Sequence, residues 1–140
     1  MQGLVGQRFP GGTYTIEHWE NVLLSDVMGV EPLPDGIAHP SFLFHAPLAG
    51  VGVAIGDIFE LCQAESEDAV RAGEYRWQLH RPLRVGATYR MSGGFVGAER
   101  KQGRRGGLMD AVTFRIDVHD DASGEHVATV FNTWLFLRSS

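Results

Sequence analysis

The 140-residue sequence has a single cysteine, Cys62, and this scarcity excludes an internal disulfide bond. It also leaves no paired cysteine spacing of the kind that indicates a zinc site, so we expect no bound metal. A lone thiol in a reducing compartment is the simplest interpretation. The sequence therefore predicts a cytoplasmic protein.

The sequence also lacks an apolar stretch long enough to cross a membrane. The first nine residues contain no apolar run after a basic region, so we expect no signal peptide. The most apolar segment, residues 42–61, is interrupted by a histidine, a proline and two acids. We therefore expect no membrane association.

Positive charge is scarce. Lys and Arg number 12 against 17 Asp and Glu, which gives a formal net charge of −5 and argues against binding to nucleic acid or an anionic membrane. The basic residues that matter are therefore expected to act locally. The length is typical of one domain, which we predict to span residues 1–140.

Helical periodicity is present in the first half. Ile16, Trp19, Leu23 and Val27 recur near helical spacing, which predicts a helix with these side chains on its packed face. Thr15 is the expected N-cap, and Gly29 is expected to end the helix. Prolines at 32, 34 and 40 then predict a loop that leads to His39.

Residues 41–61 are apolar on nearly every side, which predicts a helix buried against a sheet. Its three glycines lower helix propensity but permit close packing against another backbone. Pro47 is expected to kink or split this helix.

The second half changes to a period of two. Tyr75, Trp77 and Leu79 share one face of the first predicted strand, which Pro82 ends. Three more strands are predicted at 87–96, with a bulge at Gly93-Gly94, at 108–119 and, after a turn at 120–124, at 126–137. An α+β hot-dog fold, an antiparallel sheet wrapped around the apolar helix, buries both apolar surfaces.

Several segments carry a family resemblance: Ile37-Ala-His-Pro40, Leu79-His-Arg-Pro-Leu-Arg-Val-Gly86, Glu99-Arg-Lys101, Met109-Asp-Ala-Val-Thr-Phe114 and Asn132-Thr-Trp134. Together they resemble the MaoC-like hydratase and dehydratase family, in its N-terminal-type hot-dog domain. The resemblance implies an enzyme that adds water to, or removes it from, an acyl thioester of coenzyme A or of acyl carrier protein. It implies no cofactor beyond that thioester carrier.

The chain departs from the family's catalytic pattern. Active members carry an Asp, an Asn two residues later and a His five residues after the Asp, whereas here Asp35 and His39 are four apart and the Asn is missing. Two accounts remain open: a shifted Asp35 and His39 dyad, or loss of the dyad with catalysis supplied by a partner. We favour the second, because Ile37-Ala38-His39 aligns better with the helix entrance than with the dyad.

If the chain is active, the resemblance implies Asp35 and His39 as the acid and base. The N-terminal end of the 41–61 helix would then polarise the thioester carbonyl. The residues expected to bind the substrate are Arg100, Lys101, Arg104, Arg105 and His45. The structural alternative for the four basic residues is a solvated hairpin tip, and the alternative for His45 is a histidine of the core.

Two acids also have structural interpretations. Asp35 belongs to an Asp-Gly pair after two prolines, which is typical of a turn. Asp110 shares the parity of apolar strand residues and must be paired if buried, so we expect an ion pair with Arg104 or Arg105.

The expected assembly is a homodimer or a heteromer with a dyad-bearing hot-dog subunit, because a single sheet leaves an open edge. Two other functions stay open. One is a hot-dog acyl-CoA thioesterase, with Asp57 or Glu60 as its acid. The other is a protein that binds an acyl thioester without chemistry.

Overall fold

The computed structural model describes residues 2–66, 69–102 and 107–138. In chain order its elements are η1 (Gln2–Leu4), β1 (Gly12–Thr15), α1 (His18–Val27), α2 (Phe42–Gly50), α3 (Ile55–Leu61), β2 (Val70–Leu79), β3 (Thr88–Gln102), β4 (Leu108–Asp120) and β5 (His126–Arg138).

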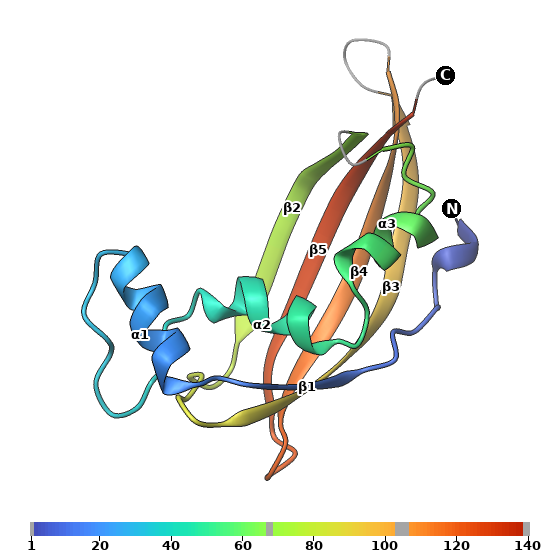
Figure 1. Cartoon of the computed structure of the whole chain (residues 1–140). Helices are drawn as coiled ribbons and strands as arrows, with labels where there is room; N and C mark the ends of the chain where they lie inside the picture. Colours follow the sequence, from blue (N-terminus) through green and yellow to red (C-terminus); the bar gives the residue numbers. More distant parts are fainter. Residues whose placement is uncertain (1, 67–68, 103–106, 139–140) are drawn as a thin grey trace.

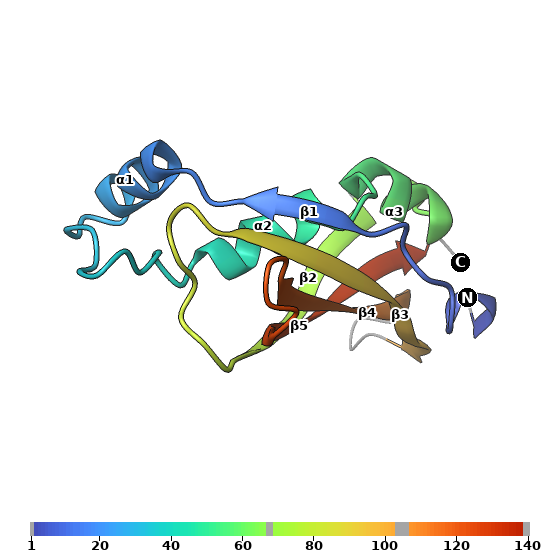
Figure 2. The same ribbon diagram turned by 90° about the horizontal axis from the view of Figure 1, so that it is seen from below.

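The strands form one antiparallel sheet in the order β1-β3-β4-β5-β2. The sheet curls, and α2 and α3 lie on its concave face, while α1 lies beyond the end of β1 (Figures 1 and 2). Consecutive hairpins join β3, β4 and β5, and β2, which precedes them in the chain, pairs with the last of these strands, β5. The predicted hot-dog fold is confirmed.

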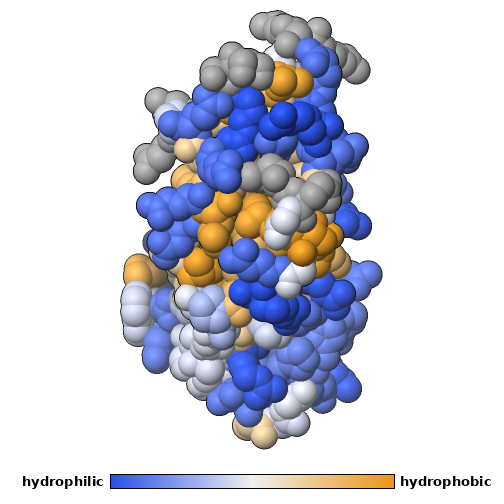
Figure 3. Space-filling model, turned by 90° about the vertical axis from the view of Figure 1, so that its right-hand side faces the viewer, coloured by the Kyte–Doolittle hydropathy of each residue, from blue (hydrophilic) through white to orange (hydrophobic). Residues whose placement is uncertain are grey.

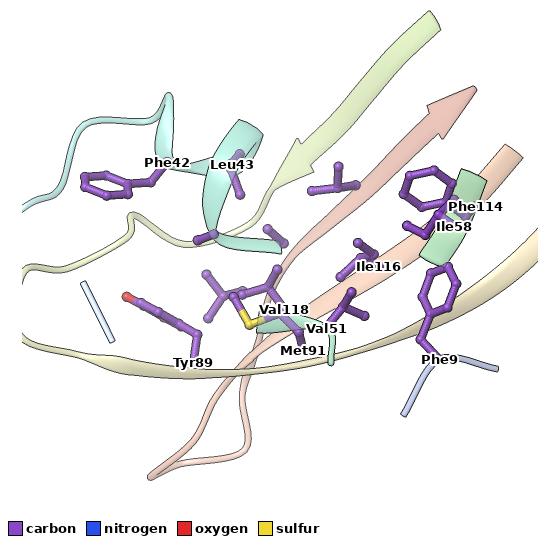
Figure 4. Packing of buried hydrophobic residues seen from close by; sticks show 14 of the residues in the cluster. Phe9, Phe42, Leu43, Val51, Ile58, Tyr89, Met91, Phe114, Ile116 and Val118 are labelled. Atoms are coloured by element: carbon purple, nitrogen blue, oxygen red, sulfur yellow. The ribbon is translucent and has the colours of Figure 1, made fainter. Parts of the chain in front are cut away.

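The core lies between the concave face and the two helices. Ile116 and Val118 of β4 and Met91 of β3 point toward Val51 and the α2 helix, as Figure 4 shows. Further along the sheet, Phe114 meets Ile58 of α3. These side chains are almost wholly buried. The apolar segment at 42–61 therefore packs where its composition predicts.

The predicted helix at 41–61 is divided in two, but not at Pro47, where a kink or a split is predicted. Pro47 is tolerated inside α2: it lacks the N–H that would bond to the carbonyl of Leu43, and the hydroxyl of Tyr75 donates to that carbonyl instead. The break comes at Gly52, whose φ of 84° suits glycine, and whose added Cβ would lie 2.4 Å from the Gly11 carbonyl oxygen. The N-terminal segment, which crosses here, sets the break.

The first predicted helix also needs correction at its start. Thr15 is not its N-cap, because Thr15 pairs with Thr88 as the last residue of β1. The cap is Glu17, whose N–H donates to Oε1 of Glu20 at 3.0 Å. At the other end, Gly29 ends the helix as predicted, with a φ of 72°.

The face of α1 that packs is the opposite of the predicted one. Trp19, Leu23 and Val27, the expected packed residues, are 62%, 57% and 80% exposed. Asn21 and Ser25 are buried instead. An apolar stripe of this helix therefore faces solvent.

Strand β3 runs six residues beyond its predicted end, so Arg100 and Lys101 lie in a strand and not in a loop. Its irregularity falls between Phe95 and Gly97, not at Gly93-Gly94. In β2, Trp77 is 44% exposed although Tyr75 and Leu79, on the same parity, are half-buried.

The surface is mixed. On the side that Figure 3 presents, apolar residues form a band between more hydrophilic ends. Within the described ranges, no helix is both long and apolar enough to span a bilayer.

Candidate active site

His39 is held at the entrance of α2 from two sides. On one side, the N–H of Ala38 donates to the carbonyl of Leu83 at 2.6 Å, and Ile37 bridges to Arg84 in antiparallel fashion. On the other side, the N–H of His39 donates to Oδ1 of Asn21 at 2.9 Å. The loop between the prolines therefore has a fixed shape at His39.

The ring of His39 is oriented by Ser41. The N–H of Ser41 donates to Nδ1 at 3.1 Å, and the Oγ of Ser41 lies 2.7 Å from the same atom. A backbone N–H can only donate, so Nδ1 is an acceptor and the neutral ring carries its proton on Nε2. His39 thus offers a ligand a hydrogen-bond donor and not a free basic nitrogen.

Asp35 occupies an exposed turn. Asp35 and Gly36 have φ values of 62° and 72°, and the N–H of Ile37 donates to the carbonyl of Pro34 at 3.3 Å. This is the geometry that Asp-Gly favours at the centre of a tight turn. Among the described residues, no hydrogen bond or ion pair joins the Asp35 carboxylate to His39. Their catalytic roles stay predictions.

The first N–H groups of α2 are already bonded. Phe42 donates to the carbonyl of His39 at 3.1 Å and Leu43 to that of Pro40 at 3.0 Å, while Ser41 bonds the His39 ring. A thioester carbonyl at this end of the helix would therefore find few free backbone donors. Nε2–H of His39 is the better donor.

An apolar groove adjoins this histidine. It has a volume of about 550 Å³ and runs between α1 and the start of α2. Its lining is Trp19, Glu20, Leu23, Leu24, Val27, Met28, Ser41 and Phe42. Ser41 both lines this groove and contacts His39, so one side chain separates the groove from the histidine.

The carboxylate of Glu20 is the charged group of the groove. It accepts hydrogen bonds from the hydroxyl of Tyr14 and from the N–H of Glu17. Burial and this neighbouring carboxylate raise the pKa of Tyr14. Glu20 therefore serves to start α1 and to fix Tyr14.

Acidic and basic residues are distributed unevenly along the chain. Residues 9–70, which supply α1, the His39 loop, α2 and α3, contain ten acids and no Lys or Arg. Arg84 does reach the site from outside this segment, with Nη1 3.4 Å from the carbonyl oxygen of Asp35.

The predicted phosphate-binding residues lie far from His39. Lys101 is 13 residues beyond Thr88 along β3, about 40 Å at 3.3 Å per residue. The His39 loop lies toward the Thr88 end, and Figure 1 shows the two ends of β3 well apart. One ligand molecule with its thioester at His39 would not place its phosphates at Arg100 and Lys101 of the same chain.

Arg100 is also engaged. Its Nε and Nη2 donate to the carboxylate of Asp110 at 2.9 and 3.1 Å, and Nε of Arg138 donates to the same carboxylate at 2.9 Å. The pKa of Asp110 is lowered, and the hydrogen bond from Arg100 makes the largest contribution to this shift. Asp110 is paired as predicted, and its partners among the described residues are Arg100 and Arg138.

The remaining predicted residues are placed as follows. Arg104 and Arg105 lie outside the described residues. His45 falls within α2, but its side chain is outside the described part of the structure. Asp57 and Glu60 are exposed on α3. In the ranges described, no three His, Cys, Asp or Glu residues are grouped to hold a metal ion.

Sequence reasoning missed Asn21 and Ser41, the residues that fix His39. A signal for Asn21 was present, because Asn21 and Ser25 are uncharged polar residues that share one face of the predicted helix. No pattern signals the role of Ser41.

Solved structures share this fold. The ChsH1-ChsH2 complex from Mycobacterium tuberculosis matches with a TM-score of 0.71 and 16% identity, covering 96% of this chain and 87% of that one. The HadBC (3R-hydroxyacyl-ACP dehydratase) complex from the same organism matches at 0.67 and 14%, covering 94% and 96%. A MaoC-like dehydratase from Rhodospirillum rubrum matches at 0.55 and 15%, covering 100% and 97%.

A hypothetical thioesterase from Streptococcus pneumoniae, in two mutant forms, is among the other structures with this fold. No family model matches the sequence, and no curated protein matches it either. At such low identities, what the solved structures share with this chain is the hot-dog fold. The family resemblance of the sequence is thus accompanied by a likeness of fold to a MaoC-like dehydratase.

Proposed function

We propose that this chain binds an acyl thioester at His39 and is a subunit of a hydratase or dehydratase whose catalytic base comes from a partner subunit. The observation that carries the proposal is the Ser41 N–H bond to Nδ1, which leaves His39 with a donor at Nε2. The exposed turn at Asp35 adds no carboxylate partner to the ring.

The proposal divides the catalytic groups between this chain and its partner. In hydration of a trans-2-enoyl thioester, a base removes a proton from water, the oxygen bonds to C3, and C2 receives a proton. Negative charge gathers on the thioester oxygen between these events, and a donor aimed at that oxygen lowers the barrier. Nε2–H of His39 is that donor, and the partner supplies the base.

The fold neighbours support a two-chain enzyme. Two of them are complexes of two named subunits, and one of these is a dehydratase. We place the partner at the open side of β2, because among the described residues β2 pairs with β5 alone, and this edge leaves backbone groups and the half-exposed Trp77 available. A second copy of the chain at this edge would make a homodimer.

Arg84 is the residue we assign to the carrier arm. It is exposed and lies beside the His39 loop, whereas Arg100 is bonded to Asp110 at the far end of β3. The arm of coenzyme A or of an acyl carrier protein, both of which carry phosphate, would leave the site along this side.

The test is hydration of crotonyl-CoA by this chain co-expressed with a hot-dog subunit that carries an Asp and His dyad. We expect turnover, reduced about 100-fold or more by His39→Ala. His18→Ala, at an exposed histidine at the start of α1 that does not line the groove, is the matched control and should leave turnover unchanged. Activity that His39→Ala does not alter would overturn the proposal.

The same assay separates the other functions. A thioesterase would release free thiol, and that release would depend on Asp57 or Glu60; we expect no thiol release, since both side chains face solvent. Saturable binding of crotonyl-CoA without turnover in any co-expressed complex would favour a binding protein.

A further inference from the structure

We propose that the apolar groove between α1 and α2 receives the acyl chain and selects chains of roughly ten carbons over short ones. This inference rests on the proposed thioester site at His39 and adds the substrate class that the site accepts.

The alternative place for an acyl chain, beneath the two main helices, is filled. Val51 and Ile58 are 0% exposed, and the sheet side chains opposite them are packed against them (Figure 4). A chain inserted there would have to displace these residues, at a cost typical of overpacked cores. The groove beside α1 needs no displacement.

The groove presents apolar side chains that the fold itself leaves uncovered. Trp19, Leu23 and Val27 are more than half exposed at helical spacing, and this stripe is the face that the sequence pattern predicts to be packed. An apolar ligand laid on the stripe would remove that surface from water.

The charge of the groove and its surroundings favours an uncharged ligand group. No Lys or Arg occurs between residues 9 and 70, and Glu20 is the charged residue that lines the groove. A phosphate or a free carboxylate would meet only negative charge here. A neutral hydrocarbon chain meets no such penalty.

Size and continuity complete the argument. The volume of about 550 Å³ falls within the range of small-ligand sites. The part of α1 that lines the groove, from Trp19 to Val27, is about 12 Å long at 1.5 Å per residue, which is the length of an extended chain of roughly ten carbons. Ser41 lines the groove and contacts Nδ1 of His39, so the groove ends one side chain away from the histidine proposed to hold the thioester.

The experiment measures binding of butyryl-, octanoyl- and dodecanoyl-CoA to the purified chain by tryptophan fluorescence, with Trp19→Phe to assign the signal to the groove. We expect affinity to rise about two- to four-fold per methylene up to roughly ten carbons and then to level off. Equal affinity at all three lengths would overturn the inference.

Leu23→Glu is the diagnostic variant, because it places a charge in the groove at a position exposed enough to leave the fold intact. We expect dodecanoyl-CoA affinity to fall at least ten-fold while butyryl-CoA affinity is unchanged. Val96→Glu, at an exposed apolar position on β3, is the matched control and should alter neither. Thermal unfolding of each variant checks that it is folded.

Other outcomes remain distinguishable. If a second copy covers the groove, Leu23→Glu will dissociate an oligomer in size-exclusion chromatography and leave the chain-length series unchanged, which overturns the inference. Length-dependent binding without hydration in any complex would overturn the proposed function and leave the groove assignment standing. Hydration of crotonyl-CoA together with acyl-CoA binding that does not depend on chain length would overturn the groove assignment and leave the proposed function standing.

Discussion

The helix α1 and the pair α2 and α3 use apolar residues in opposite ways. In α2 and α3 most of the described large apolar side chains are buried or half-buried against the sheet, and Ile58 is fully covered, whereas Ile55 at the start of α3 is exposed. In α1 the apolar stripe is exposed, and the buried residues are Asn21 and Ser25. One region builds the core, and the other keeps apolar surface available beside His39.

The difference shows that helical periodicity identifies a helix without identifying its packed face. The spacing of Trp19, Leu23 and Val27 is real, but the contact that fixes α1 is a polar one, from Asn21 to the His39 backbone. Apolar surface that is left uncovered in this way indicates a binding surface. The predictions below test whether the two regions differ as described.

The largest effect is expected at the ion cluster that fixes the end of α3. Arg138 donates to the carboxylate of Asp110 and also to the carbonyls of Cys62 and Gln63, directly after α3. Asp110→Asn leaves the nearly buried Arg138 without its counter-charge, so we expect the free energy of unfolding to fall by about 3 kcal/mol. Urea unfolding measures it, and a loss below about 1 kcal/mol would contradict the role of the cluster.

The same carboxylate has a pH signature. Hydrogen bonds from Arg100 and Arg138 hold the pKa of Asp110 below its usual value, so its folded pKa lies below its unfolded one. Its stabilisation is therefore complete above pH of about 4 and is lost as pH falls through the folded pKa. The stability difference between wild type and Asp110→Asn should shrink below about pH 4; a constant difference down to pH 2 would speak against this pairing.

A direct comparison of the two helical regions comes next. Ile58→Ala in α3 removes a fully buried side chain and should lower the free energy of unfolding by about 2 to 4 kcal/mol. Leu23→Ala in α1 removes an exposed one and should change it by less than about 0.5 kcal/mol. Equal losses in urea unfolding would mean that α1 packs in solution as the sequence pattern predicts.

The smallest effect concerns the polar contact of α1. Asn21→Ala leaves the His39 N–H without its acceptor, and we expect a loss of about 1 to 2 kcal/mol. Ser25→Ala, one turn later on the same face, is the matched control. Its buried hydroxyl has no hydrogen-bond partner among the described residues, so we expect no loss, or a slight gain from the better helix propensity of Ala.

Much of the fold follows from local signals. The change to a period of two at residue 73, the turn at 120–124 and the apolar segment at 42–61 are enough to predict a sheet curled around helices. A split in this helix is predicted at Pro47, but the true position of the break was out of reach, because it depends on Gly11 and Gly52 meeting across the chain. The length of β3 was missed because Gly97 absorbs an irregularity that does not end the strand.

The candidate site was predictable only in part. The prolines around the loop place His39 at the entrance of a helix, and that placement is seen. The state of its ring depends on Ser41, and the distance between His39 and Arg100 depends on how far β3 extends. Both are properties of the folded chain that no residue pattern contains.

The central claim is that this chain supplies a donor to the thioester and no base. Incubation of the purified chain alone with crotonyl-CoA, followed by loss of enoyl-thioester absorbance, tests it most directly. We predict no hydration above the rate without protein. Turnover by the chain alone that disappears in both His39→Ala and Asp35→Asn would contradict the claim and establish a shifted dyad.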